Sequence, residues 1–267
     1  INTTTLSAMT KSESTEMQRI VVNHAMDLQG GKAIQDGPNN VMQSLYEAVP
    51  VGITVEGANI LTRNLVIAGQ GLTQSHKYAR KIMDAATNDD KNLVWDLGLS
   101  AVGDLAKKAG KSFALSMTDG RGTGTDGVKI APELKRAHQQ VNRMAAAFGI
   151  AADCAMFHMG GALKRKEDTT RDLGGAWTMI NYAAMTMKHW DEQGRNKEDL
   201  PLVNWAVQHC LHNAEESLKS VIANYPSNNV LGKAVKGFMK VATNLGDDYP
   251  KPLYRLNHKI AELVTTD

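Results

Sequence analysis

Apolar residues recur every three or four positions along most of this chain, which is the period of an amphipathic α-helix. One such stripe runs through residues 6–28 and stops at Gly30-Gly31. Two more occupy residues 141–159 and 173–187, with the alternation of four and three that suits a packed bundle. No convincing run shows the period of two typical of β-strands, so we predict an all-α fold.

Glycine and proline divide the stripes into separate helices. Gly37-Pro38 precedes a short helix that begins near Val41. Pro50 is expected to close that helix and to leave residues 51–55 extended. Further helices are predicted over residues 78–86, 93–105, 132–159, 201–221, 229–245 and 253–264. The Gly- and Thr-rich stretch 118–127 is predicted to be a mobile surface loop, because no strand precedes it and no Gly-Lys-Ser/Thr ends it.

Glu56 lies at the most informative junction of the chain. Glu56-Gly57 opens an almost wholly apolar run, residues 60–68, which predicts a buried helix reaching about Gln70. A carboxylate there would be partly withdrawn from water, so its charge needs an explanation. The simplest one is that an acidic group near a first helical turn satisfies free N–H groups and complements the helix dipole.

Composition narrows the class of protein. At 42% hydrophobic, 267 residues can bury a sizeable core. Thirty basic against 28 acidic side chains give +2, which argues against nucleic acid as a partner. Cys154 and Cys210 lie far apart, so we expect no disulfide and a reducing compartment. No apolar run reaches the roughly 18 residues of a spanning helix. We therefore expect a cytoplasmic protein, with peripheral attachment to the inner membrane as a narrower option.

Three neighbouring residues invite a metal interpretation. His209, Cys210 and His212 can all ligate zinc, but their offsets on a helix do not project them to one side. We expect structural or solvent-facing roles for them and no metal site. The basic cluster 164–166 is offset by nearby acidic residues and is expected to be a solvated turn.

An ordered set of motifs resembles the C-terminal helical domain of acyl-CoA dehydrogenases, and more narrowly the large bacterial fatty acyl-CoA dehydrogenases with an extra helical extension. The set covers nearly the whole chain: Asp27-Leu28-Gln29-Gly30-Gly31, Asn39-Asn40, Tyr46, Pro50, residues 55–63, residues 160–165, residues 191–196 and residues 199–205. A single Glu-Gly is a weak motif, whereas the ordered set is specific.

The resemblance implies a chemical role for Glu56. The family's catalytic base is the Glu of this Glu-Gly, which removes the α-proton of a fatty acyl-CoA while the β-hydrogen leaves as hydride to FAD. The product is a trans-2-enoyl-CoA. The backbone N–H of Glu56 is implied to bond the thioester carbonyl, and Gly57 leaves room for the substrate.

The cofactor contacts are implied in the same way. Gly30 and Gly31 match the family's Gly-Gly, whose backbone approaches the FAD of a neighbouring subunit. The family usually has Thr after Glu-Gly and an aromatic residue before it, whereas this chain has Ala58 and Val55. Any flavin contact from Ala58 is therefore expected through its backbone.

We expect residues 1–80 to be part of the dehydrogenase helical bundle and residues 81–267 to form the helical extension, which contains no candidate active site. The chain begins without Met and inside a helical pattern, which suggests a piece of a longer protein. The family's N-terminal and central domains, an electron acceptor and further subunits are the implied partners. A helical interaction or assembly module without catalysis is the alternative.

Overall fold

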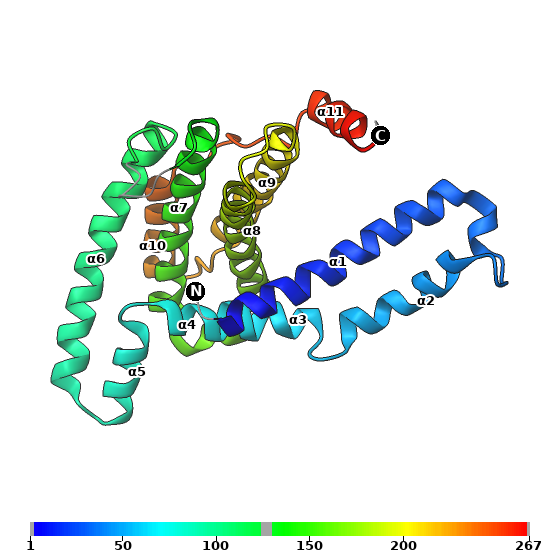
Figure 1. The fold of residues 1–267 in the computed structure, drawn as a ribbon. Coiled ribbons are helices and arrows are strands. Elements are labelled where there is room, and N and C mark those ends of the chain that lie inside the picture. Colours follow the sequence, from blue (N-terminus) through cyan, green and yellow to red (C-terminus); the bar gives the residue numbers. More distant parts are fainter. Residues whose placement is uncertain (1–2, 124–129, 266–267) are drawn as a thin grey trace. The chain divides into compact units, whose positions relative to one another are not determined.

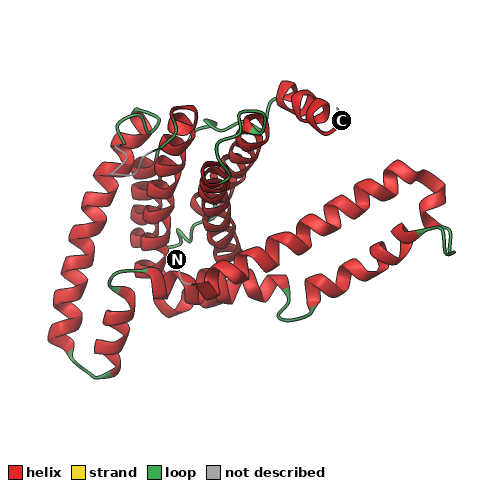
Figure 2. Cartoon of the chain, in the orientation of Figure 1, coloured by secondary structure: helices red, strands yellow, loops and turns green. Residues whose placement is uncertain are grey.

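The computed structural model describes residues 3–123 and 130–265, and all regular secondary structure in these ranges is helical (Figure 2). The prediction of an all-α fold is confirmed. The chain divides into two compact units, Ile1–Lys77 and Tyr78–Asp267. The division follows Lys77, close to the boundary expected after residue 80.

The first unit is built on two long helices that lie side by side and run in opposite directions (Figure 1). Its helices are α1 Thr3–Gln29, η1 Gly30–Ile34, α2 Val41–Thr54, α3 Asn59–Leu61, η2 Thr62–Gly71 and α4 Leu72–Ser75. The predicted end of the first helix is correct, since Gly30 has φ +60°, which a side chain would disfavour. Asn40 caps α2 by accepting a hydrogen bond from the N–H of Met42 at 3.1 Å.

Two sequence predictions in this unit are wrong. Helix α2 continues through Pro50 to Thr54, so residues 51–54 are helical and not extended. Proline removes one helical hydrogen bond, but the contacts of α2 with α1 keep the helix intact across it.

The second wrong prediction concerns the helix after Glu56. It begins at Asn59, not Gly57, and passes through the ten-residue π-helical stretch η2 before ending at Ser75. Gly69 permits this wide coil, because a Cβ there would lie 3.2 Å from the carbonyl oxygen of Asn64. The apolar run is only partly buried: Ile67 and Ala68 are covered, whereas Ile60, Leu61 and Leu65 are exposed.

The second unit is a helical bundle around α7. Its helices are α5 Ala79–Thr87, α6 Lys91–Met117, η3 Pro132–Leu134, α7 Lys135–Met159, η4 Gly160–Arg165, α8 Glu167–Glu192, α9 Leu200–Ala223, α10 Val230–Thr243 and α11 Tyr254–Thr265. Helix α7 packs against α6, α8, α9 and α10, and α8 and α9 form the most extensive pair. The predicted helices are confirmed here, including the cap on α6, where Asp90 accepts a hydrogen bond from the N–H of Leu93.

The stretch Pro132–Arg165 is long and apolar enough to cross a membrane by length and composition alone. It was not expected from the sequence, because charged residues interrupt its apolar runs. Arg143 and Asp153 are buried on α7, and neighbouring helices surround it. Within this unit the stretch is therefore the central helix of a bundle.

Arg143 connects α7 to two loops of the second unit. Its side chain is 3% exposed, and it donates to Asp119 Oδ1 at 2.8 Å and to Asp248 Oδ2 at 2.7 Å. The Tyr249 hydroxyl donates to the same Asp119 oxygen at 3.0 Å, and Arg136 also pairs with Asp119. One guanidinium thus joins the turn after α6 to the loop after α10.

Glu215 on α9 bonds the backbone of the loop after α10. Its carboxylate is buried and accepts hydrogen bonds from the N–H groups of Asp248 at 3.3 Å and Tyr249 at 3.0 Å. Burial raises the pKa of Glu215 above its ordinary value of 4.5, and the Tyr249 N–H and the Lys219 ammonium oppose part of that rise.

Replacing Arg143 with Met is expected to lower the free energy of unfolding by about 3 kcal/mol, because Asp119 and Asp248 lose their shared buried cation. Urea denaturation of the chain measures the change. Arg171→Met is the control: its ion pairs are half exposed, and a loss below about 1 kcal/mol is expected. Equal losses of stability in the two variants would contradict the role of Arg143 as the buried cation that Asp119 and Asp248 share.

The raised pKa of Glu215 predicts a pH dependence with a definite sign. The native state holds the proton more tightly than the unfolded chain, so stability falls as pH rises from 4.5 through the raised pKa. The stability of wild type relative to Glu215→Gln is therefore expected to decrease from acidic to neutral pH. Urea midpoints across this interval test it, with Glu216→Gln, at an exposed glutamate of the same helix, as the control.

Candidate functional site

Glu56 lies at the tip of the loop that joins α2 to α3. Its φ is +53° and that of Gly57 is +90°, so two successive residues have a left-handed backbone. For a residue with a Cβ this conformation costs about 1–2 kcal/mol. The Glu56 side chain is exposed, which contradicts the expectation of partial withdrawal from water.

The capping explanation of Glu56 fails on geometry. The N-cap residue of α3 is Ala58, and there is no side-chain capping hydrogen bond at this helix start. Within the described ranges, the Glu56 carboxylate has no hydrogen-bond partner. Helix capping therefore does not explain the strained backbone at Glu56.

A lysine of α1 holds this loop by its backbone. Lys11 Nζ donates to the carbonyl oxygen of Gly57 at 2.9 Å, to that of Ile53 at 3.4 Å and to Asn59 Oδ1 at 2.8 Å. The first two oxygens lie on either side of Glu56 in sequence. The ammonium thus closes the loop at both of its ends.

Asn59 extends this network toward α1. Its buried amide donates to Thr15 Oγ1 at 2.9 Å, to Glu16 Oε1 at 3.0 Å and to the Ser12 carbonyl at 3.3 Å. Thr62 Oγ1 also donates to the Gly57 carbonyl, at 3.2 Å. Exposed and part-buried polar contacts consequently hold the loop against α1.

Roles for Lys11 and Asn59 in this loop were not predicted from the sequence. A usable signal existed on α1, where Lys11, Ser12, Thr15 and Glu16 form a polar face at helical spacing. This polar face was missed because the helix was predicted from its apolar stripe alone. Asn59 gave no such signal, because an Asn after a Glu-Gly loop is usually solvated.

Of the other predicted site residues, Gly57 and Ala58 directly follow Glu56, whereas the glycine pair lies elsewhere in the unit. Gly30 and Gly31 are exposed at the far end of α2 from Glu56, and the 14 residues of α2 separate the two places by about 20 Å. The structure therefore does not bring the glycine pair and Glu56 into one site.

The backbone at the glycine pair borders open space. A Cβ added at Gly30 or Gly31 would meet nothing within 4 Å, so the chain leaves room for close approach there. At Ala58 only backbone groups can serve as polar contacts, as the sequence predicted.

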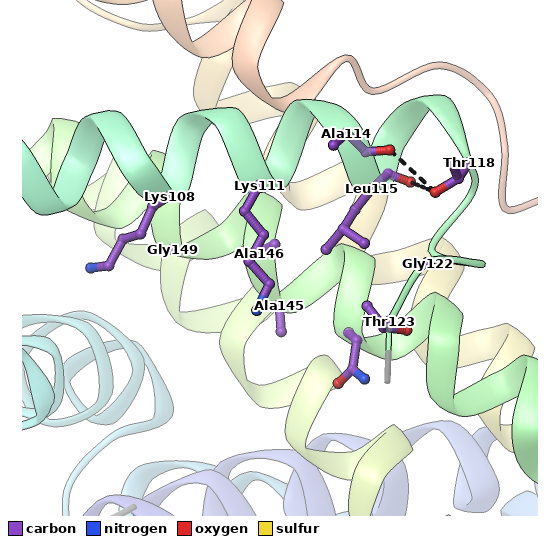
Figure 3. Close-up of a pocket in the computed structure, with 11 residues that line it drawn as sticks. Lys108, Lys111, Ala114, Leu115, Thr118, Gly122, Thr123, Ala145, Ala146 and Gly149 are labelled. Carbon is purple, nitrogen blue, oxygen red and sulfur yellow. Dashed lines mark hydrogen bonds between the residues drawn. The ribbon is translucent and has the colours of Figure 1, made fainter. Parts of the chain in front are cut away.

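A pocket of about 670 Å³ lies in the second unit between α6 and α7 (Figure 3). Lys108 and Lys111 of α6 line this pocket, together with small residues of α7 that include Ala145, Ala146 and Gly149. Lys108 already pairs with Asp153 at 2.7 Å. Among the described residues that line the pocket there is no carboxylate or histidine, so it offers no acid–base pair.

The histidines of α9 have local roles. His209 stacks on Trp205 with ring centroids 5.1 Å apart, and His212 Nδ1 bonds the Tyr249 carbonyl at 2.8 Å. These contacts agree with the structural roles expected for both residues. Within residues 3–123 and 130–265, no group of histidine, cysteine or carboxylate side chains could hold a metal ion.

Comparison with known families identifies the class of the chain. Residues 73–267 match the family described as acyl-CoA dehydrogenase, C-terminal, bacterial type. The match spans the entire second unit, and the chain belongs to this family. The resemblance inferred from sequence motifs is thereby confirmed. Glu56 and the glycine pair precede the matched residues. No solved structure matches the chain.

Glu56→Gly is expected to raise the free energy of unfolding by about 0.5–1 kcal/mol, since relief of the left-handed strain exceeds the entropy cost of glycine. Glu47→Gly is the matched control, because Glu47 is an exposed glutamate inside α2. It is expected to lower stability by about 0.5–1 kcal/mol. Thermal and urea unfolding of both variants measure these changes. A lower free energy of unfolding in both variants would rule out backbone strain at Glu56.

Proposed function

We propose that this chain is part of an FAD-dependent acyl-CoA dehydrogenase that converts fatty acyl-CoA to trans-2-enoyl-CoA, with Glu56 as the base that removes the α-proton. The main support is the strained backbone of Glu56, which polar contacts of the loop hold in place and whose exposed carboxylate caps no helix. Strain of this kind is typical of functional residues. Family membership of the second unit supplies the reaction class.

The local groups suit proton abstraction beside a thioester. The Glu56 carboxylate has no partner in the described structure, so its lone pairs are available to a substrate C–H. The backbone N–H of Glu56 is also unpaired there, and it can donate to a thioester carbonyl whose oxygen gains charge as the proton leaves. Both contacts come from one residue, so the loop conformation sets their mutual geometry.

Glu56 needs further protein around it to act as a base. An exposed carboxylate is well solvated, whereas proton removal from carbon needs a shielded, aligned base. The exposed apolar side chains of Ile60, Leu61 and Leu65 follow directly on α3 and η2. We propose that the enzyme's N-terminal and central domains cover this face and exclude water from Glu56.

The distance between the two candidate sites bears on assembly. When bound, FAD would accept the β-hydrogen of the substrate as hydride. The glycine pair lies about 20 Å from Glu56, the length of α2. We propose that Gly30 and Gly31 approach the cofactor of a neighbouring subunit and that Ala58 and Gly57 face the site of their own subunit, which requires a homo-oligomer. An electron acceptor would reoxidise the enzyme.

A helical assembly module is the second candidate function. One observation favours it: large apolar side chains remain exposed along α6 in two groups with spacings of three or four, Trp95, Leu99 and Val102 and then Phe113 and Met117. Flavin absorbance of the purified complete protein separates the candidates. A yellow protein whose flavin is reduced on addition of acyl-CoA supports the dehydrogenase function. A colourless protein that still self-associates supports the assembly function.

Glu56→Gln in the complete enzyme is expected to lower turnover by roughly 10²–10⁴-fold, the usual effect of losing a general base. The amide is nearly isosteric, so flavin content and acyl-CoA binding are expected to persist. Glu47→Gln, on an exposed turn of α2, is the control and is expected to retain full activity. Near-normal turnover of Glu56→Gln would exclude Glu56 as the base.

A further inference from the structure

Lys11 uses its full hydrogen-bonding capacity at the Glu56 loop. An ammonium has three N–H donors, and Lys11 has three acceptors: the carbonyl oxygens of Ile53 and Gly57 and the side-chain oxygen of Asn59. All three acceptors are uncharged. A lysine with a purely electrostatic role would face a carboxylate, so this arrangement indicates a geometric one.

The carbonyls that Lys11 binds define the position of Glu56. Ile53 belongs to the last turn of α2, whose final carbonyls lack helical partners and attract a cation. Gly57 follows Glu56 directly and has φ +90°. Because one ammonium bonds both oxygens, it sets the separation of the loop ends and hence the backbone of Glu56 between them.

We propose that Lys11 is a positioning residue for Glu56, holding the loop so that the carboxylate and N–H of Glu56 point at the substrate. Lys11 itself touches neither substrate nor cofactor in this scheme. The inference rests on the proposed role of Glu56 as the base. Lys11, which lies on α1 and 46 positions from Gly57 in sequence, thereby becomes one of the residues that shape the candidate site.

The test is a double-mutant cycle in the complete flavin-loaded enzyme, with Lys11→Met, Glu56→Gln and the double variant. A residue that acts only through Glu56 loses its effect once the base is gone, whereas general structural damage adds to the loss. Lys107→Met, an exposed lysine of α6, is the matched control. Flavin content and melting temperature are measured for every variant.

Lys11→Met is expected to lower kcat by about 10²-fold, the effect of misplacing a catalytic group by an ångström, with little change in KM. In the Glu56→Gln background the same substitution is expected to change the residual rate by less than about threefold. Lys11→Arg, which keeps donors and charge, is expected to recover part of the rate. Lys107→Met is expected to match wild type.

Equal losses from Lys11→Met in both backgrounds, or wild-type kcat in that variant, would overturn the proposal. Wild-type turnover of Glu56→Gln alone would instead overturn the assignment of the base, so the two failures are distinguishable. If Lys11→Met does not retain flavin, Lys11→Gln, which keeps one donor group, is taken through the same cycle and judged by the same outcomes.

Discussion

In both units a cation on a long helix bonds polar groups of a loop that the flanking helices leave unsatisfied. In the first unit Lys11 bonds the backbone carbonyls on either side of Glu56. In the second unit Arg143 bonds side-chain carboxylates and so joins the loops that carry Asp119 and Asp248. Loss of either cation would remove bonds that connect these loops to the long helix, so the loop positions depend on these two side chains.

This constraint connects the fold to the proposed chemistry. The Glu56 backbone is left-handed, an unfavourable state that persists only where surrounding contacts outweigh its cost. Lys11, Asn59 and Thr62 provide those contacts through polar bonds. The Glu56 carboxylate remains exposed and without a protein partner, so its lone pairs are available, as a base requires. The second unit, whose family is known, contains a comparable left-handed pair, Asp119-Gly120, but there Arg143 and the Tyr249 hydroxyl bond the carboxylate, unlike that of Glu56.

Most helices could be predicted from the sequence, because apolar spacing and capping residues act within a few positions. Gly30 ends α1 and Asp90 begins α6 as expected. Prediction failed where tertiary contacts outweigh local preference: α2 passes through Pro50 because α1 supports it. The run from Ile60 is only half buried, because the polar side chains on this helix face α1.

The sequence by itself determined the all-α class, the family resemblance and Glu56 as the residue of interest, since each depends on patterns that are local or recur in order along the chain. Only the tertiary structure decided how Glu56 is held. Lys11 and Gly57 are 46 positions apart, and no local pattern records that a lysine on one helix bonds the carbonyls of a distant loop. The separation of Gly30 from Glu56 likewise follows from the antiparallel course of α1 and α2, which packing sets.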